Sequence, residues 1–375
     1  MLFQIKETAD YKKIYIFFGL ISFKILYHNP SIAIRIFGIN ILTLYLFNGK
    51  LLIQLNIKIP IPFIDDELFK AKFLYNCVKE NYTKDFDCIY SLCGSPSGET
   101  YIILNLLNII LRKNCSKQPI LVVDKMFKYQ LCKLFQPEIP VILCKNLSFL
   151  YFNKKNFHKI KGCKVYNYFP TQHYIKQDIL INTKDEHYFS YIVSKLDLNR
   201  NLSFNKPKIS DTAKQNISLF IKENNLKNFV IIAPEANTCS EGCINWTKIC
   251  NKLQTLGYKV VLNITDMKNY IPHTIPVLLT YEEMFILTQQ ASAFIGLRSG
   301  LVEILSQCSE NTPFFIFYTD FPKRGVLQAM SAEKALSGFT LKKLPNVNKN
   351  NITELVAEEN SIEELFKKLI RAKNN

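Results

Sequence analysis

Short apolar runs alternate with longer amphipathic stretches over most of this chain from residue 87 onward. Runs of this length that end in turns predict buried strands, and stretches with apolar residues at helical spacing predict helices. The predicted strands are 87–92, 118–123, 139–143, 229–233, 258–264, 274–279, 293–296 and 313–317, and the predicted helices are 101–111, 125–135, 245–256, 281–290, 301–306 and 361–371. The alternation is typical of doubly wound α/β domains built on parallel sheets.

The first part of the chain has a different pattern. Residues 15–27 and 32–47 are strongly apolar, but Lys24 and Arg35 interrupt them. Neither run offers the ~20 apolar residues that a membrane span needs. The two runs resemble each other, which predicts a repeat of β-hairpin units. Such a block would either pack on the main body or attach to an anionic membrane surface through its aromatic and basic residues.

The polar stretch between the two α/β units predicts a connection between domains. We therefore expect a β-rich N-terminal extension at residues 1–86, an N-terminal Rossmann-like domain at 87–200, an interdomain connection at 201–227 and a C-terminal Rossmann-like domain at 228–375. The predicted fold class is α/β, with the two doubly wound domains facing a cleft. A chain of 375 residues is long enough for two such domains with complete cores.

Composition narrows the functional classes. The net charge of +16 suits a nucleic acid, an anionic membrane or a phosphorylated substrate. The lysines are scattered and no zinc-finger spacing is present, so we expect no nucleic-acid partner. No secretory signal pattern opens the chain. We therefore expect a cytoplasmic protein with free buried thiols, and peripheral attachment to the inner membrane face as an alternative. The cysteines inside apolar runs are Cys77, Cys88, Cys132, Cys144 and Cys250.

A metal site is not predicted. Cys239 and Cys243 form a CxxxC pair, but zinc would need two further ligands, and the five histidines supply no matching pair. No cofactor is expected either.

The segment Gly296-Leu297-Arg298-Ser299-Gly300 joins a predicted strand to a predicted helix. Free backbone N–H groups and the helix dipole make such a turn suited to anions. Arg298 adds a guanidinium whose geometry matches phosphate, and Glu303 could accept hydrogen bonds from a hydroxylated group. Together these features predict a nucleotide-sugar site. The alternative is an ordinary strand–helix joint with a solvated arginine.

A second turn, residues 93–100, follows the first predicted strand of the N-terminal domain. It contains Gly94 and Gly98 and places the carboxylate of Glu99 where open α/β sheets bind ligands. It is neither a dinucleotide fingerprint nor a P-loop. Glu99 could instead simply complement the dipole of the following helix.

The chain resembles the two-domain, GT-B type sugar-nucleotide glycosyltransferases, and more narrowly a divergent lipopolysaccharide heptosyltransferase. The resemblance covers roughly residues 87–317. It rests on Gly98-Glu99-Thr100, His187 with Tyr191, the strand at 230–237 followed by Trp246, the stretch from Gly257 to Val260, and Ser299-Gly300. The sequence departs from the family in three ways: Glu99 stands where the family has Asp, the family's Thr-Gly-x-x-His is absent, and Arg298 is extra.

The resemblance implies an inverting, metal-independent transfer of a sugar from a nucleotide-sugar donor to a glycan or lipid-linked acceptor in bacterial surface polysaccharide or lipopolysaccharide synthesis. A carboxylate of the N-terminal domain would act as general base, which here is Glu99. The expected donor-binding residues are Arg298, Ser299, Gly300, Glu303, Asn237 and Lys248. The expected acceptor-binding residues are Gly94, Gly98, Thr100 and His187.

Several alternatives stay open at this point. His187 could pack or cap a helix, Trp246 could belong to the core, and Lys248 could be a solvated helix residue. The same scaffold could also serve a polysaccharide pyruvyl transferase, or a basic scaffold or nucleic-acid-binding protein without catalysis.

Overall fold

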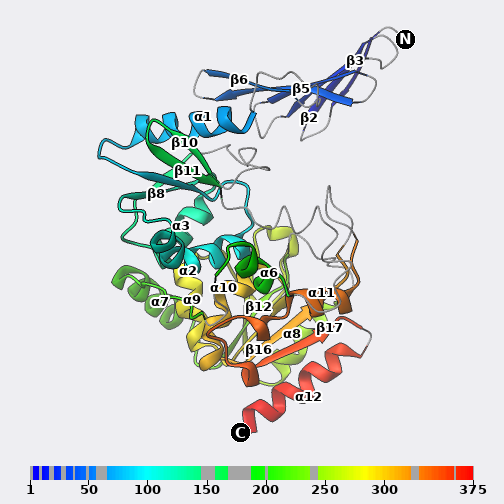
Figure 1. The fold of residues 1–375 in the computed structure, drawn as a ribbon. Coiled ribbons are helices and arrows are strands. Elements are labelled where there is room, and N and C mark those ends of the chain that lie inside the picture. Colours follow the sequence, from blue (N-terminus) through cyan, green and yellow to red (C-terminus); the bar gives the residue numbers. More distant parts are fainter. Residues whose placement is uncertain are drawn as a thin grey trace.

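Three β-sheets organise the protein, and helices cover the second and third (Figure 1). The computed structural model describes residues 3–7, 11–16, 21–26, 31–36, 39–47, 50–55, 66–144, 157–167, 187–198, 202–236, 244–321, 329–358 and 360–374. No helix among these residues is both long enough and apolar enough to cross a bilayer.

The N-terminal block forms an antiparallel sheet in which each strand pairs with the next along the chain. Its strands are β1 (Phe3–Glu7), β2 (Tyr11–Ile16), β3 (Ile21–Leu26), β4 (Ser31–Ile36), β5 (Ile39–Phe47) and β6 (Lys50–Leu55). The prediction of β-hairpin units is confirmed.

The second sheet has the order β10-β11-β7-β8-β9. Its strands are β7 (Cys88–Ser91), β8 (Pro119–Val123), β9 (Val141–Leu143), β10 (Phe157–Ile160) and β11 (Cys163–Asn167). All pairs are parallel except the β10–β11 hairpin. Helix α1 (Asp66–Asn81) packs on one face, and α2 (Ser97–Lys113) and α3 (Met126–Phe135) pack on the other.

The third sheet is parallel throughout and has the order β14-β13-β12-β15-β16-β17. Its strands are β12 (Phe229–Ala233), β13 (Lys259–Asn263), β14 (Ile275–Val277), β15 (Ala293–Leu297), β16 (Phe314–Tyr318) and β17 (Ile352–Val356). Numbered within the sheet, this is the 3-2-1-4-5-6 order of a Rossmann fold. The prediction of two doubly wound α/β units is confirmed.

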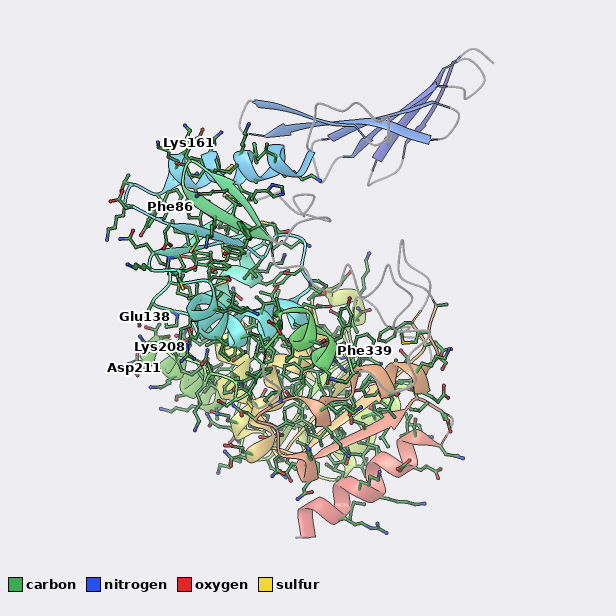
Figure 2. The ribbon with its side chains drawn as sticks, viewed as in Figure 1. Phe86, Glu138, Lys161, Lys208, Asp211 and Phe339 are labelled. Carbon is green, nitrogen blue, oxygen red and sulfur yellow. The ribbon has the colours of Figure 1, made fainter. Side chains whose placement is uncertain are left out.

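One apolar cluster fills the space between the second and third sheets. It contains residues of α2 and α3, of α9 (Tyr281–Gln290) and α10 (Gly300–Leu305), and of the facing sides of both sheets. Two further clusters lie on the outer sides, one under α1 and one under α8 (Trp246–Thr255) and α12 (Ser361–Asn374). The two halves therefore share a packed middle layer (Figure 2).

The stretch expected to be only a connection contains helix α7 (Asp211–Glu223), capped by Ser210, whose hydroxyl accepts from the Ala213 amide. Its apolar stripe is thin, because only Ala213 and Ile217 are buried. The residues before α7 are tied to the N-terminal half by Lys208, which donates to Glu138 at 2.9 Å (Figure 2).

Candidate functional site

The second and third sheets each contain a point at which the order of the strands reverses. In the third sheet the strand order reverses between β12 and β15, and open α/β sheets bind ligands at the carboxyl ends of strands beside such a reversal. The residue after β15 is Arg298. In the second sheet, chain order reverses beside β7, and the turn after β7 leads into α2, which carries Glu99. The topology thus selects the two turns that the sequence singled out.

The N-termini of α2 and α10, which follow these two turns, are in direct contact. A Cβ built on Gly98 would lie 1.6 Å from Glu303 Oε2, and one built on Gly300 would lie 2.0 Å from Ser97 Oγ and 2.8 Å from the Gly98 nitrogen. Only glycine leaves room for these approaches. The contact brings the carboxylate of one half of the protein against the first turn of the long helix of the other half.

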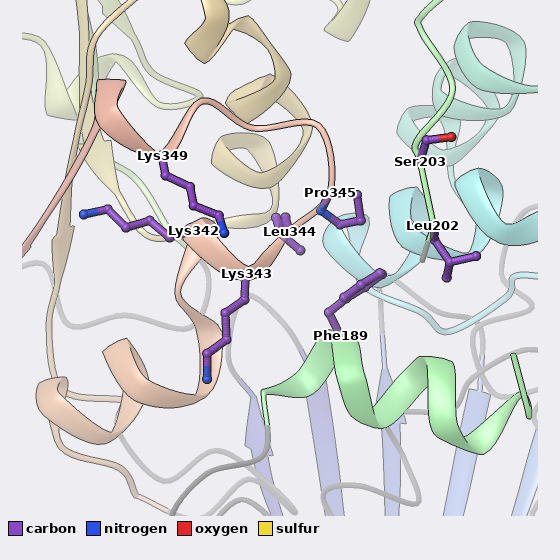
Figure 3. Close-up of a pocket in the computed structure, with 8 residues that line it drawn as sticks. All are labelled: Phe189, Leu202, Ser203, Lys342, Lys343, Leu344, Pro345 and Lys349. Carbon is purple, nitrogen blue, oxygen red and sulfur yellow. The ribbon is translucent and has the colours of Figure 1, made fainter. Parts of the chain in front are cut away.

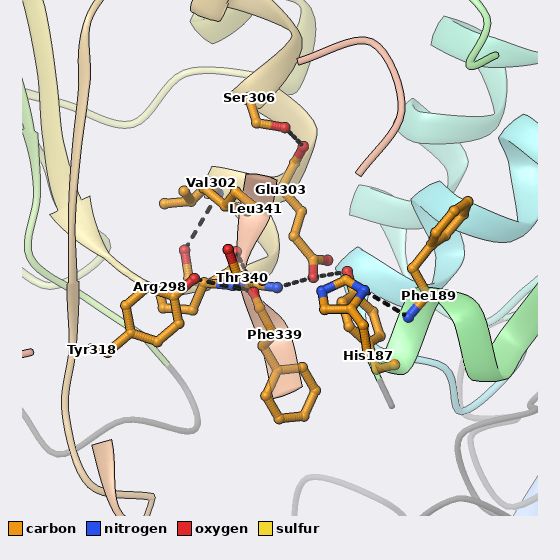
Figure 4. Close-up of polar contacts among 12 residues, drawn as sticks. His187, Phe189, Arg298, Val302, Glu303, Ser306, Tyr318, Phe339, Thr340 and Leu341 are labelled. Atoms are coloured by element: carbon orange, nitrogen blue, oxygen red, sulfur yellow. Dashed lines mark hydrogen bonds and ion pairs between the residues drawn. The ribbon is translucent and has the colours of Figure 1, made fainter. Parts of the chain in front are cut away.

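Arg298 and Glu303 form a buried ion pair at this contact (Figure 4). The Arg298 guanidinium also donates from Nε to the Phe339 carbonyl and from Nη1 to the Ser299 carbonyl, each at 2.9 Å. The Tyr188 hydroxyl donates to the same Glu303 oxygen that Arg298 contacts. Tyr188 begins α6 (Tyr188–Lys195), so three separate segments of the chain meet at one carboxylate.

Burial and mutual charge shift the pKa values in this cluster. Burial, with the neighbouring Glu303 carboxylate adding to it, raises the pKa of Glu99 to about 7. Burial lowers the pKa of Arg298, but Glu303, Tyr318 and Tyr188 together outweigh burial, so the pKa of Arg298 is raised well above its ordinary value. Burial and the same carboxylate also raise the pKa of Tyr188 well above 10. Glu99 is therefore the group of this cluster that titrates near neutral pH.

A second buried ion pair fixes the turn before Glu99, and the sequence analysis missed it. Lys128 Nζ contacts Asp124 Oδ1 at 2.5 Å and donates to the Leu92 carbonyl at 2.9 Å. The Gly94 amide donates to the other Asp124 oxygen at 3.2 Å. An acidic residue directly after a strand with lysine four positions later was the signal available in the sequence.

The predicted acceptor-binding residues either stabilise the turn before α2 or cap a helix. Thr100 is buried, its hydroxyl donates to the Pro96 carbonyl, and it shares a hydrogen bond with Ser95. Gly94 adopts a φ of 80°, as the turn requires. His187 is buried and caps α6, accepting from the Phe189 amide at 3.3 Å, which confirms the capping alternative. Burial lowers the pKa of His187 to about 3, so its ring is neutral.

The remaining predicted donor-binding residues lie around the cluster. Ser299 caps α10 by accepting from the Val302 amide. Lys248 is exposed in the first turn of α8, where its amide donates to the Asn245 side chain at 2.9 Å. Asn237 lies outside the described residues. Tyr188, which sequence reasoning missed, joins the site through a contact 115 positions away in the chain.

The cysteines show no sign of a metal centre in the described part of the chain. No group of three or more potential metal ligands occurs there. The five cysteines predicted to be buried thiols, Cys77, Cys88, Cys132, Cys144 and Cys250, are buried thiols. Cys239 and Cys243 lie outside the described residues.

Comparison with solved structures finds similar glycosyltransferases, including heptosyltransferases. A glycosyl transferase family 9 protein from Veillonella parvula matches with a TM-score of 0.46 and 13% identity over 77% of this chain and 97% of its own. The ADP-heptose lipopolysaccharide heptosyltransferase II of E. coli matches with a TM-score of 0.47 and 11% identity over 77% and 100% of the two chains.

The iron-containing dodecameric glycosyltransferase TibC of enterotoxigenic E. coli matches with a TM-score of 0.44 and 14% identity, over 77% of each chain. No protein-family model and no curated protein matches the sequence.

Proposed function

We propose that the protein is a glycosyltransferase that moves a sugar from a nucleotide-sugar donor to a glycan or lipid-linked acceptor. One observation carries the proposal: the titratable carboxylate of Glu99 in one Rossmann-like half lies within electrostatic range of Arg298 in the other half, and both residues follow strands at reversal points of their sheets. Glycosyl transfer needs a base at the acceptor hydroxyl and positive charge at the departing diphosphate.

Glu99 is the proposed general base. A base acts best when its pKa lies near the working pH, and a pKa of about 7 meets that condition. The side chain is half-buried in the first turn of α2, and the Asp124–Lys128 pair holds the turn before it. A carboxylate in this position can take the proton of an acceptor hydroxyl as the hydroxyl oxygen attacks the anomeric carbon. The bond from that carbon to the nucleoside diphosphate breaks in the same step, which inverts the configuration at the anomeric carbon. No metal is assigned a part in this step.

Arg298 is the proposed diphosphate ligand, and its present partner suggests how it would act. The guanidinium already binds an anion, the Glu303 carboxylate, in a buried setting. A donor diphosphate would replace that carboxylate at Arg298 and release Glu303 to accept from the ribose or sugar hydroxyls. Because α2 and α10 touch at Gly98 and Gly300, the donor would enter as these two helix ends separate.

A panel of nucleotides tests the proposal without knowledge of the sugar. A ligand that binds the folded protein raises its melting temperature by mass action. We expect one of UDP, GDP, ADP or CMP to raise the melting temperature and Arg298→Ala to remove that shift. If every nucleotide leaves the melting temperature unchanged, while an RNA or DNA oligomer binds with an affinity that falls steeply with salt, the basic-scaffold alternative replaces the proposal.

A further inference from the structure

A solvent-open pocket of about 490 Å³, called the cavity below, lies beside the cluster, between α6 and the segment that follows α11 (Ala332–Phe339) (Figure 3). Phe189 lines one side, and Leu344 and Pro345 line another. Residues of the interdomain stretch complete it. The remaining lining residues are Leu202, Ser203, Lys342, Lys343 and Lys349. The volume is in the range of roughly 300–1,000 Å³ that is usual for small-molecule sites.

The charge on this cavity is of one sign. Its lining includes three lysines and no carboxylate. None of the ion pairs found in the described part of the chain involves these lysines. Figure 3 shows all three lysines on the segment that also carries Leu344; Lys342 and Lys343 extend away from Phe189, whereas Lys349 extends toward Leu344. The positive charge of these lysines acts on buried groups, since the charge of Lys343 contributes to the lowered pKa of His187.

The walls of the cavity are held from both halves of the protein. Asn346 donates to the Phe204 carbonyl at 2.6 Å, and the Asn205 amide donates to the Asn105 side chain in α2 at 2.7 Å. Gln307 donates to the Tyr101 hydroxyl at 2.7 Å. Hydrogen bonds from both halves therefore hold the backbone on two sides of the cavity. Tyr188, which contacts Glu303, is the neighbour of Phe189 in the same helix.

We propose that this cavity binds a sugar phosphate unit of the glycan, with the sugar ring against Phe189, Leu344 and Pro345 and the phosphate at Lys343 and Lys349. The saccharide part of this assignment rests on the proposed function, whereas the anion part rests on the lysines alone. Lysine is a compact cation that suits phosphate as a point charge. An inorganic phosphate would occupy only part of the volume, and Phe189, Leu344 and Pro345 offer an apolar contact to a ligand that also has a C–H face.

The test uses the full chain and three probes: glucose 1-phosphate, inorganic phosphate and glucose, measured by calorimetry at low salt. We expect glucose 1-phosphate to bind most tightly. Lys343→Glu combined with Lys349→Glu should weaken it by at least about tenfold, because both charges are reversed at the phosphate. The matched control reverses two exposed lysines elsewhere, Lys222→Glu with Lys367→Glu, and should leave the affinity within about twofold.

Ser203→Trp fills the cavity without changing charge, so it should reduce binding of glucose 1-phosphate and leave that of phosphate unchanged. Equal affinity for phosphate and glucose 1-phosphate in every variant would overturn the sugar assignment. If Lys222→Glu with Lys367→Glu weakens binding of glucose 1-phosphate equally, binding depends on non-specific surface charge. That result would overturn the assignment of a site to this cavity. Nucleotide binding is measured in the same variants. If it is absent everywhere while glucose 1-phosphate still binds, the proposed function fails and the cavity stands.

Discussion

The contact between the two halves leaves least room for a side chain at Gly98, and Gly98→Ala tests this constraint. The new Cβ would lie 1.6 Å from Glu303 Oε2, whereas ordinary contact begins at 3.4 Å. The carboxylate must therefore retreat by about 1.8 Å, the difference between these two distances. It is the far end of a side chain, but Arg298 and Tyr188 both hold it.

The cost of that retreat follows from the partners that Glu303 would lose. Removing one partner of a buried ion pair costs about 3–5 kcal/mol, and overpacking a core position costs about 1–3 kcal/mol. Because Glu303 can keep part of its contact with Arg298 as it moves, we expect Gly98→Ala to lower the free energy of unfolding by about 2–4 kcal/mol. Urea unfolding followed by the fluorescence of Trp246, the only tryptophan, measures the change in the C-terminal half.

A double-mutant cycle separates this mechanism from a general preference for glycine. In Glu303→Ala the obstructing carboxylate is gone, so adding Gly98→Ala should cost less than about 1 kcal/mol further. The two changes would then show a coupling energy of about 1 kcal/mol or more. If their effects simply add, Gly98 does not accommodate Glu303, and the interpretation of this contact is refuted.

Three further predictions address catalysis, donor binding and location. Glu99→Gln should reduce turnover by about 10²-fold or more with little change in nucleotide affinity. Because a base must be deprotonated, turnover of the unmodified enzyme should rise with pH through about 7, and a flat pH–rate profile would contradict the role. Arg298→Lys should already weaken nucleotide binding by about tenfold, because the planar guanidinium and not only its charge is used; unchanged affinity in a thermal-shift titration would reject it. The protein should pellet with anionic vesicles at low salt and be released at high salt, and deleting the residues before Pro62 should reduce pelleting without affecting nucleotide binding. Release only by detergent would mean that the N-terminal block inserts into the bilayer.

Local patterns were enough to predict most of the α/β framework. Strand β12 and helix α9 occupy the predicted residues, because a five-residue apolar run and a Thr280–Glu283 capping box mark them clearly. The β10–β11 hairpin was missed because both strands are short and mix apolar with polar residues, and β10 exposes Phe157 while it buries His158. Helix α7 was missed because it buries only Ala213 and Ile217.

The site was predictable in its location but not in its pairing. Arg298, Glu303 and Glu99 were identified from two turns, since turns after strands are local features. Arg298 binds Glu303 rather than solvent because Tyr188 and Phe339 also bind this pair. Both residues lie far from Arg298 in the sequence. The need for glycine at positions 98 and 300 likewise arises only when two helices from different halves meet. Such contacts follow from tertiary packing, which periodicity does not report.

The single apolar cluster between the two sheets has a consequence for how the chain is made. Helix α2 buries Ile102, Leu106 and Leu107 in a cluster that also contains residues of α9 and α10, nearly two hundred positions later. A ribosome adding about 5–20 residues per second would leave that face of α2 uncovered for on the order of ten seconds or more. During that time the N-terminal half exposes a surface that a holding chaperone would recognise. Efficient production of this protein should therefore depend on chaperone capacity more than on its final stability.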